Sequence, residues 1–126
     1  MTAPIIPGLN DHEIPALLDT AAAAGATFAG YTVMRLPYAV KDIFIRWLED
    51  HAPGRKNRVL GRVREIRGGR LNVSEWGRRM QGEGIFAEQI RALFAVSARR
   101  AGLDRERRAL STAAFRRPGQ QLQLAI

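Results

Sequence analysis

The first 37 residues carry the pattern that most constrains the fold of this 126-residue chain. A short apolar run at residues 3–6, without polar alternation, predicts a strand buried on both faces. Pro7 and Gly8 end that run, and Asn10 and Asp11 then offer side-chain oxygens of the kind that cap a helix. A buried strand, a tight turn and a capped helix are the beginning of a βαβ unit.

The residues that follow complete this unit. Residues 11–24 predict an amphipathic helix, with Pro15 in its first turn, where proline is tolerated, and Gly25 at its left-handed end. Its apolar stripe consists of Ile14, Leu17, Leu18, Ala21 and Ala22. Residues 27–34 are rich in aromatic and β-branched side chains and predict a second strand. Two strands joined through a helix require a parallel crossover, which is right-handed in nearly all proteins.

After residue 37 the sequence predicts helices and turns. A helix ending near His51 carries an apolar stripe of Val40, Ile43, Phe44, Trp47 and Leu48. The next helix ends at Gly68-Gly69 and buries Val59, Leu60, Val63 and Ile66, while its other face carries Arg55, Lys56, Arg58, Arg62 and Arg67. A further helix, running to Gly102, is lined by Phe86, Ile90, Leu93, Phe94 and Ser97.

Two remaining segments lack a helical period. Residues 70–84 are expected to be irregular, with Trp76 and Met80 as apolar anchors. The last twenty or so residues are expected to form an extended tail in which residues 122–124 pair as an edge strand. The predicted fold is therefore α+β and mostly helical, with a right-handed βαβ unit at residues 1–37 and three or more helices in a basic region at residues 38–126.

The charge is unevenly distributed along the chain. Residues 1–50 contain 3 Lys and Arg against 6 Asp and Glu, a net charge of −3, whereas residues 51–126 contain 17 against 6, a net charge of +11. Arginine favours bidentate contacts with phosphates and carboxylates, so an anionic partner such as nucleic acid is one interpretation. The other is a solvated basic surface with no partner. The residues predicted to contact nucleic acid are Arg70, Trp76, Arg78 and Arg79.

No catalytic constellation is evident in the sequence. The absence of cysteine excludes disulfides, thiol nucleophiles and cysteine-bound metals, and the two histidines, His12 and His51, lie too far apart along the chain to suggest a metal site. Asp11 and Glu13 could form an acid–base pair, but acidic residues also favour helix N-termini. We therefore predict no catalytic residue and no metal ligand. No apolar run approaches the roughly 20 residues of a membrane span, and we expect a cytoplasmic protein.

Three stretches taken in order resemble one enzyme family. Residues 3–11 (APIIPGLND), 13–26 (EIPALL followed by AGA) and 30–37 (GYTVMRLP) resemble the late strands of radical SAM enzymes, in particular the spore photoproduct lyase-like branch, often labelled DNA repair photolyase. Residues 67–72 (RGGRLN) and 79–84 (RMQGEG) resemble the C-terminal region of the same branch.

The resemblance implies the fold and cofactors of that family. These are a partial β/α barrel, S-adenosylmethionine bound at the carboxyl ends of the strands, and a [4Fe–4S] cluster held by three cysteines. The reduced cluster cleaves the cofactor to a radical that abstracts a substrate hydrogen, and DNA lesion repair is the implied activity. By position in the family, the resemblance places Ile5, Ile6, Gly8, Asn10 and Asp11 at the cofactor.

This chain departs from the family pattern because it has no cysteine. We therefore expect it to be the C-terminal part of a longer enzyme, inactive alone and without a cofactor of its own, while the parent enzyme holds the cluster and S-adenosylmethionine. The alternative function is a non-catalytic basic helical module that binds nucleic acid or an acidic partner. Unpaired strand edges also predict self-association of the chain, and no membrane partner is expected.

Overall fold

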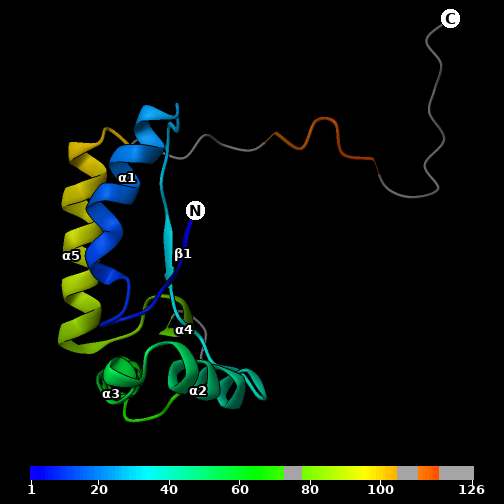
Figure 1. Cartoon of the computed structure of the whole chain (residues 1–126). Coiled ribbons are helices and arrows are strands. Elements are labelled where there is room, and N and C mark those ends of the chain that lie inside the picture. Colours follow the sequence, from blue (N-terminus) through cyan, green and yellow to red (C-terminus); the bar gives the residue numbers. More distant parts are fainter. Residues whose placement is uncertain (73–77, 105–110, 117–126) are drawn as a thin grey trace, which may run out of the picture.

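The computed structural model describes residues 1–72, 78–104 and 111–116. Within them, helices dominate and the only sheet has two strands, β1 (Thr2–Ile5) and β2 (Tyr31–Val33), which pair in parallel (Figure 1). A 3-10 turn at Asp11–Glu13 and helix α1 (Ile14–Ala23) lie between them in the sequence. The α+β class and the parallel pairing predicted from the sequence are confirmed.

The first strand begins one residue earlier and is less buried than the sequence predicts, and the second strand is shorter. Ala3 and Pro4 are exposed, so the prediction of a strand buried on both faces is wrong for the first part of β1. The second strand covers Tyr31–Val33 instead of residues 27–34, because β1 is only long enough to pair with its last residues. Further upstream, the Ala29 amide instead donates to the Leu103 carbonyl (3.1 Å), beyond the last helix.

Helix α1 begins without the predicted cap. Neither Asn10 nor Glu13 makes a side-chain capping bond to the residues after it. The Asn10 and Asp11 side chains instead accept hydrogen bonds from backbone amides that precede them, so the capping role predicted for these two residues is wrong. The C-terminal end is as predicted, since Gly25 adopts a φ of 90° and its amide bonds back into the helix.

Helices α2 (Val40–His51) and α3 (Lys56–Glu65) follow, separated by a 3-10 turn at Pro53–Arg55. In α3 the prediction is confirmed, because Val59, Leu60, Val63 and the following Ile66 are buried. In α2 it is only partly right, since Phe44 and Leu48 are buried while Val40, Ile43 and Trp47 are exposed. Arg67, predicted on the solvent side, is 3% exposed, because it lies beyond the last turn of α3 and folds inward.

The last helices are α4 (Arg78–Gln81) and α5 (Gly84–Arg100), and α5 packs alongside α1 (Figure 1). The α4 turn lies in a segment predicted to be irregular, and Met80 is 41% exposed instead of forming a core anchor. In α5, Ile90, Phe94 and Ser97 are buried as predicted, but Leu93 is 37% exposed.

The buried apolar side chains form two clusters. The sheet cluster joins β1, α1, β2 and α5 and contains Ile5, Ile14, Leu18, Val33, Ile66, Ala87, Ile90, Phe94, Ala98 and Leu103. The α2–α3 cluster contains Ile6, Leu36, Phe44, Leu48, Val59, Leu60 and Val63. The chain passes from one cluster to the other between Ile5 and Ile6, at the end of β1.

Two further findings concern the described residues alone. No helix within them combines the length and apolar composition needed to cross a membrane. The edge strand predicted at residues 122–124 and the anchor Trp76 lie outside the described residues.

Candidate functional site

The loop at residues 6–11 follows the carboxyl end of β1 and closes on itself through hydrogen bonds. The Ile6 amide donates to Asn10 Oδ1 (2.7 Å), and the Gly8 amide donates to Asp11 Oδ2 (2.9 Å). Asn10 Nδ2 also donates to the Pro4 carbonyl (3.2 Å). Ligands of open parallel sheets bind beyond the carboxyl ends of the strands, so this loop lies where a binding site is expected.

Three arginines from the 3-10 turn at Pro53–Arg55 and from α3 contact this loop. We call Arg55, Arg58 and Arg62, which share one side of the 3-10 turn and α3, the arginine cluster. Arg55 donates to the Leu9 carbonyl (3.5 Å), Arg58 donates to the Gly8 carbonyl (3.2 Å), and Arg62 donates to Asp11 Oδ2 (3.4 Å). The cluster therefore holds the loop by charge-assisted contacts to its backbone and to its one carboxylate.

Arg62 also connects the loop to α5. Its guanidinium carbon lies 4.6 Å from the centre of the Phe86 ring, a distance at which the cation is attracted to the ring face. A pocket of about 320 Å³ opens beside this contact and is lined by Asp11, His12, Arg62, Phe86, Gln89, Ile90 and Leu93. The lining of the pocket therefore combines apolar side chains with a guanidinium, an imidazole, an amide and a carboxylate.

The five residues that the resemblance places at the cofactor occupy different environments. Ile5 belongs to the sheet cluster and Ile6 to the α2–α3 cluster, with exposed fractions of 2% and 9%. Gly8 and Asn10 are bonded within the loop, and the space beside Gly8 is filled by Arg62. Of the five, Asp11 lines the pocket. The Asp11 side chain can therefore contact a ligand in the pocket, whereas the Ile5 and Ile6 side chains are buried in the core.

The residues of this chain do not fit the [4Fe–4S] cluster that the resemblance implies. The chain has no cysteine. Residues 1–72, 78–104 and 111–116 also contain no group of three or more His, Asp or Glu side chains that could hold a metal ion. Any ligands of such a cluster must come from outside this chain.

A second polar group lies at the end of β2, at a position that the sequence analysis does not identify. Arg67 Nη2 donates to the Met34 carbonyl (2.8 Å) and more weakly to the Val33 carbonyl (3.5 Å). Burial, and to a lesser extent the nearby Arg35, lowers the pKa of Arg67. Arg35 Nη1 contacts Met80 Sδ at 3.8 Å. Helical periodicity could not have located Arg67, because Glu65 is the last residue of α3.

The residues predicted to bind nucleic acid are only partly described. Arg70 is exposed, just beyond the Gly68-Gly69 turn. Trp76 and the side chains of Arg78 and Arg79 lie outside the described residues, although the backbone of the two arginines begins α4. Their contact with nucleic acid stays a prediction.

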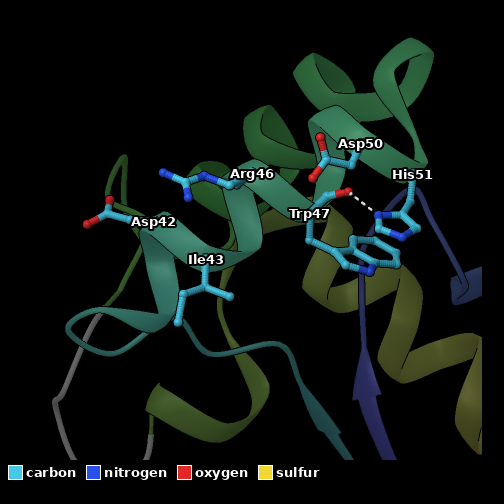
Figure 2. A pocket seen from close by; sticks show the side chains of 6 residues that line it. All are labelled: Asp42, Ile43, Arg46, Trp47, Asp50 and His51. Atoms are coloured by element: carbon cyan, nitrogen blue, oxygen red, sulfur yellow. Dashed lines mark hydrogen bonds between the residues drawn. The ribbon is translucent and has the colours of Figure 1, made fainter.

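The two histidines occupy exposed positions near helix ends. His12 lies 4.0 Å from Glu13, and its side chain is 66% exposed. His51 ends α2, where its ring stacks on Trp47 (5.1 Å between ring centres) and Nδ1 lies 3.1 Å from the Trp47 carbonyl oxygen. Figure 2 shows this pair beside Asp42, Ile43, Arg46 and Asp50, which together line a pocket of about 340 Å³ on the outer face of α2.

Comparison of the chain with protein-family models, curated proteins and solved structures finds no match. Its function is therefore inferred from its own residues and geometry.

Proposed function

We propose that this chain is the C-terminal part of a radical SAM enzyme of the spore photoproduct lyase-like branch, with possible substrates among DNA lesions. The observation that carries the proposal is the parallel pairing of β1 and β2 around α1, with the loop at residues 6–11 at the carboxyl end of β1. Strands so connected are the repeating unit of β/α barrels, whose active sites lie at this edge.

The sheet geometry supports the proposal further. A two-stranded parallel sheet is rarely stable by itself, and in the described part of the chain each of its strands has one unpaired edge. In this proposal the crossover is right-handed, and further strands of a partial barrel pair with β1 and β2. The chain contributes the loop and the pocket beside Asp11 as one wall of the S-adenosylmethionine site, and the cluster ligands come from another part of the enzyme.

The test uses the native protein. An antibody raised against residues 1–104 is used to measure its size in the source cells by immunoblot and to purify it without oxygen. After reduction with dithionite, 5′-deoxyadenosine formed from S-adenosylmethionine is measured by mass spectrometry. We expect a band far above 14.0 kDa and formation of 5′-deoxyadenosine, while the recombinant 126-residue chain produces none. A native protein that forms no 5′-deoxyadenosine, whatever its size, would overturn the proposal.

The arginine cluster favours a second candidate, a non-catalytic module that binds nucleic acid. Arg55, Arg58 and Arg62 converge on the loop at residues 6–11. Arg62 pairs there with Asp11, whereas Arg55 and Arg58 donate to backbone carbonyls and so contact no carboxylate in the loop. Phosphate contacts release counterions, so affinity for a duplex oligonucleotide should fall at least tenfold between about 50 and 200 mM salt. Arg55→Glu should weaken this binding, whereas Arg99→Glu on α5 serves as the matched control. Binding that does not respond to salt would exclude this candidate.

A further inference from the structure

The outer face of α2 exposes apolar side chains that the sequence predicts to be buried. Phe44 and Leu48 turn inward, but Val40 is 45% exposed, Ile43 68% and Trp47 41%. Tyr38, two residues before the first residue of α2, is also exposed (96%). A cluster of exposed aliphatic and aromatic side chains is typical of an interaction surface.

Tyr38 adds a second sign that this face has a function. Its φ of 45° makes it the one residue other than glycine with a positive φ in the described part of the chain. Such a conformation is energetically unfavourable for a residue with a side chain. Because its ring is almost fully exposed, no packing within the described residues offsets that cost.

Charged residues accompany the apolar row in a regular order. Asp42, Arg46 and Asp50 follow one another at intervals of four residues, beside Ile43 and Trp47 (Figure 2). Neither Arg46 nor Asp50 forms an ion pair within residues 1–72, 78–104 and 111–116, and the nearest base to Asp42 is its neighbour Lys41 at 3.9 Å. The face therefore offers an acid, a base and an acid in a row, and of these three only Asp42 has an ion-pair partner within the described residues, its exposed neighbour Lys41.

We propose that this face binds the same face of a second copy of the chain, with the two α2 helices antiparallel about a two-fold axis near Phe44. In that arrangement, the residue two positions after Phe44 in one helix faces the residue two positions before Phe44 in the other helix. Arg46 of each copy then faces Asp42 of the other.

The apolar residues fit the same arrangement. Ile43 lies next to the axis and meets Ile43 of the second copy, while Val40 packs near Trp47. A parallel pair in register would instead place Asp42 on Asp42 and Arg46 on Arg46, so charge repulsion selects the antiparallel pair. A single helix face covers less than the roughly 800 Å² per partner of a standard interface, and the dimer should therefore be weak and concentration-dependent.

Sedimentation equilibrium of the full chain over roughly 10 µM to 1 mM tests the proposal. The average mass should rise from 14.0 kDa towards twice that value. Arg46→Asp and Asp42→Arg each place like charges opposite one another and should weaken dimerisation at least tenfold. The double variant Asp42→Arg/Arg46→Asp exchanges the two charges and should restore it to within about threefold of the original.

Two further variants make the result decisive. Arg64→Asp changes charge in the same way on the exposed side of α3 and should leave the dimer unchanged, while Ile43→Glu at the axis should abolish it. Circular dichroism checks that each variant is folded. A chain that stays monomeric at 1 mM, a dimer that survives Arg46→Asp, or a double variant that fails to recover would each overturn the proposal. In the second case the copies associate through another surface, such as the strand edges.

Discussion

Gly8 has a φ of 82°, a conformation that residues with a side chain rarely adopt. A Cβ atom at this position would lie 3.1 Å from Arg62 Cδ and 3.3 Å from Nη1. The absence of a side chain therefore has two effects: it permits the turn after β1, and it lets Arg62 pack directly against the loop backbone. Gly25 has a similar φ of 90°, but nothing lies within 4 Å of the corresponding Cβ position.

This difference predicts the outcome of a matched pair of substitutions. Gly25→Ala should lower the free energy of unfolding by about 1 kcal/mol, the cost of a left-handed alanine. Gly8→Ala should lower it more, because Arg62 must also move. Urea denaturation measures both values. In an Arg62→Ala background, Gly8→Ala should lower the free energy of unfolding by no more than Gly25→Ala does. If the two substitutions lowered it equally in the original chain, Arg62 would not be in contact with residue 8.

At the scale of elements, α5 is fixed to the sheet by an aromatic contact. The Phe94 ring lies 4.6 Å from the Tyr31 ring of β2, and Phe94 is 7% exposed. The neighbouring Leu93 is 37% exposed and lines the pocket instead of the core. The two adjacent side chains of α5 thus differ in role, because Phe94 packs on the sheet while Leu93 lines the pocket.

Truncation of these two side chains should have unequal effects. Phe94→Ala should cost about 3–5 kcal/mol of unfolding free energy, because it leaves a cavity between α5 and β2. Leu93→Ala should cost about 1 kcal/mol or less. Chemical denaturation followed by far-ultraviolet circular dichroism checks both values. Similar losses for the two variants would contradict the position of α5 on the sheet.

An ion pair joins α2 to α3 and makes one part of the stability depend on pH. Lys56 Nζ contacts Glu49 Oε1, and this hydrogen-bonded, charged partner lowers the pKa of Glu49. A carboxylate with a depressed pKa stabilises the folded state above its usual pKa of about 4.5, and that contribution is lost as the pH falls through the lowered value.

The pairing is tested by titration of the Glu49 side chain by NMR. Its midpoint should lie below that of an ordinary glutamate, and Lys56→Met should return it to the ordinary range. Lys41→Met, which removes a lysine next to Asp42 on the same helix, serves as the control and should leave the Glu49 midpoint in place. An unchanged midpoint in Lys56→Met would show that the pair does not form in solution.

At the scale of the whole molecule, the two apolar clusters are tightly joined. Ile5 and Ile6 are adjacent in the chain but belong to different clusters. The Glu83 amide donates to the Ile66 carbonyl (3.0 Å), which connects the start of α5 with the end of α3, and Arg62 contacts both the loop and Phe86. Structural changes in either cluster should therefore affect the other.

We accordingly predict that residues 1–104 unfold as one cooperative unit. Leu18→Ala in the sheet cluster and Leu48→Ala in the α2–α3 cluster should each lower the same unfolding free energy, by about 2–5 kcal/mol. Native-state hydrogen exchange measures this at amides of α1 and of α3. If Leu48→Ala accelerated exchange only in α2 and α3, the clusters would be independent.

The sequence by itself determined the local elements and their order. The apolar period of α3, the glycines after α1 and α3, and the strand–helix–strand pattern depend on neighbours within a few residues, and each was predicted correctly. The predicted caps at Asn10 and Asp11 failed for a non-local reason. Their side-chain oxygens instead accept hydrogen bonds from the Ile6 and Gly8 amides, in a loop that follows β1 and is contacted by α3.

Only the tertiary structure decided which amphipathic faces are covered. Val40, Ile43 and Trp47 share an apolar stripe with Phe44 and Leu48, and periodicity gives no reason to separate them. α3 covers one side of that stripe and leaves the other exposed. In the same way, periodicity predicts Arg67 on the surface, but its side chain is buried because it donates to the Val33 and Met34 carbonyls at the end of β2. Periodicity fixes which side chains share a face, whereas burial depends on contacts between segments far apart in the chain.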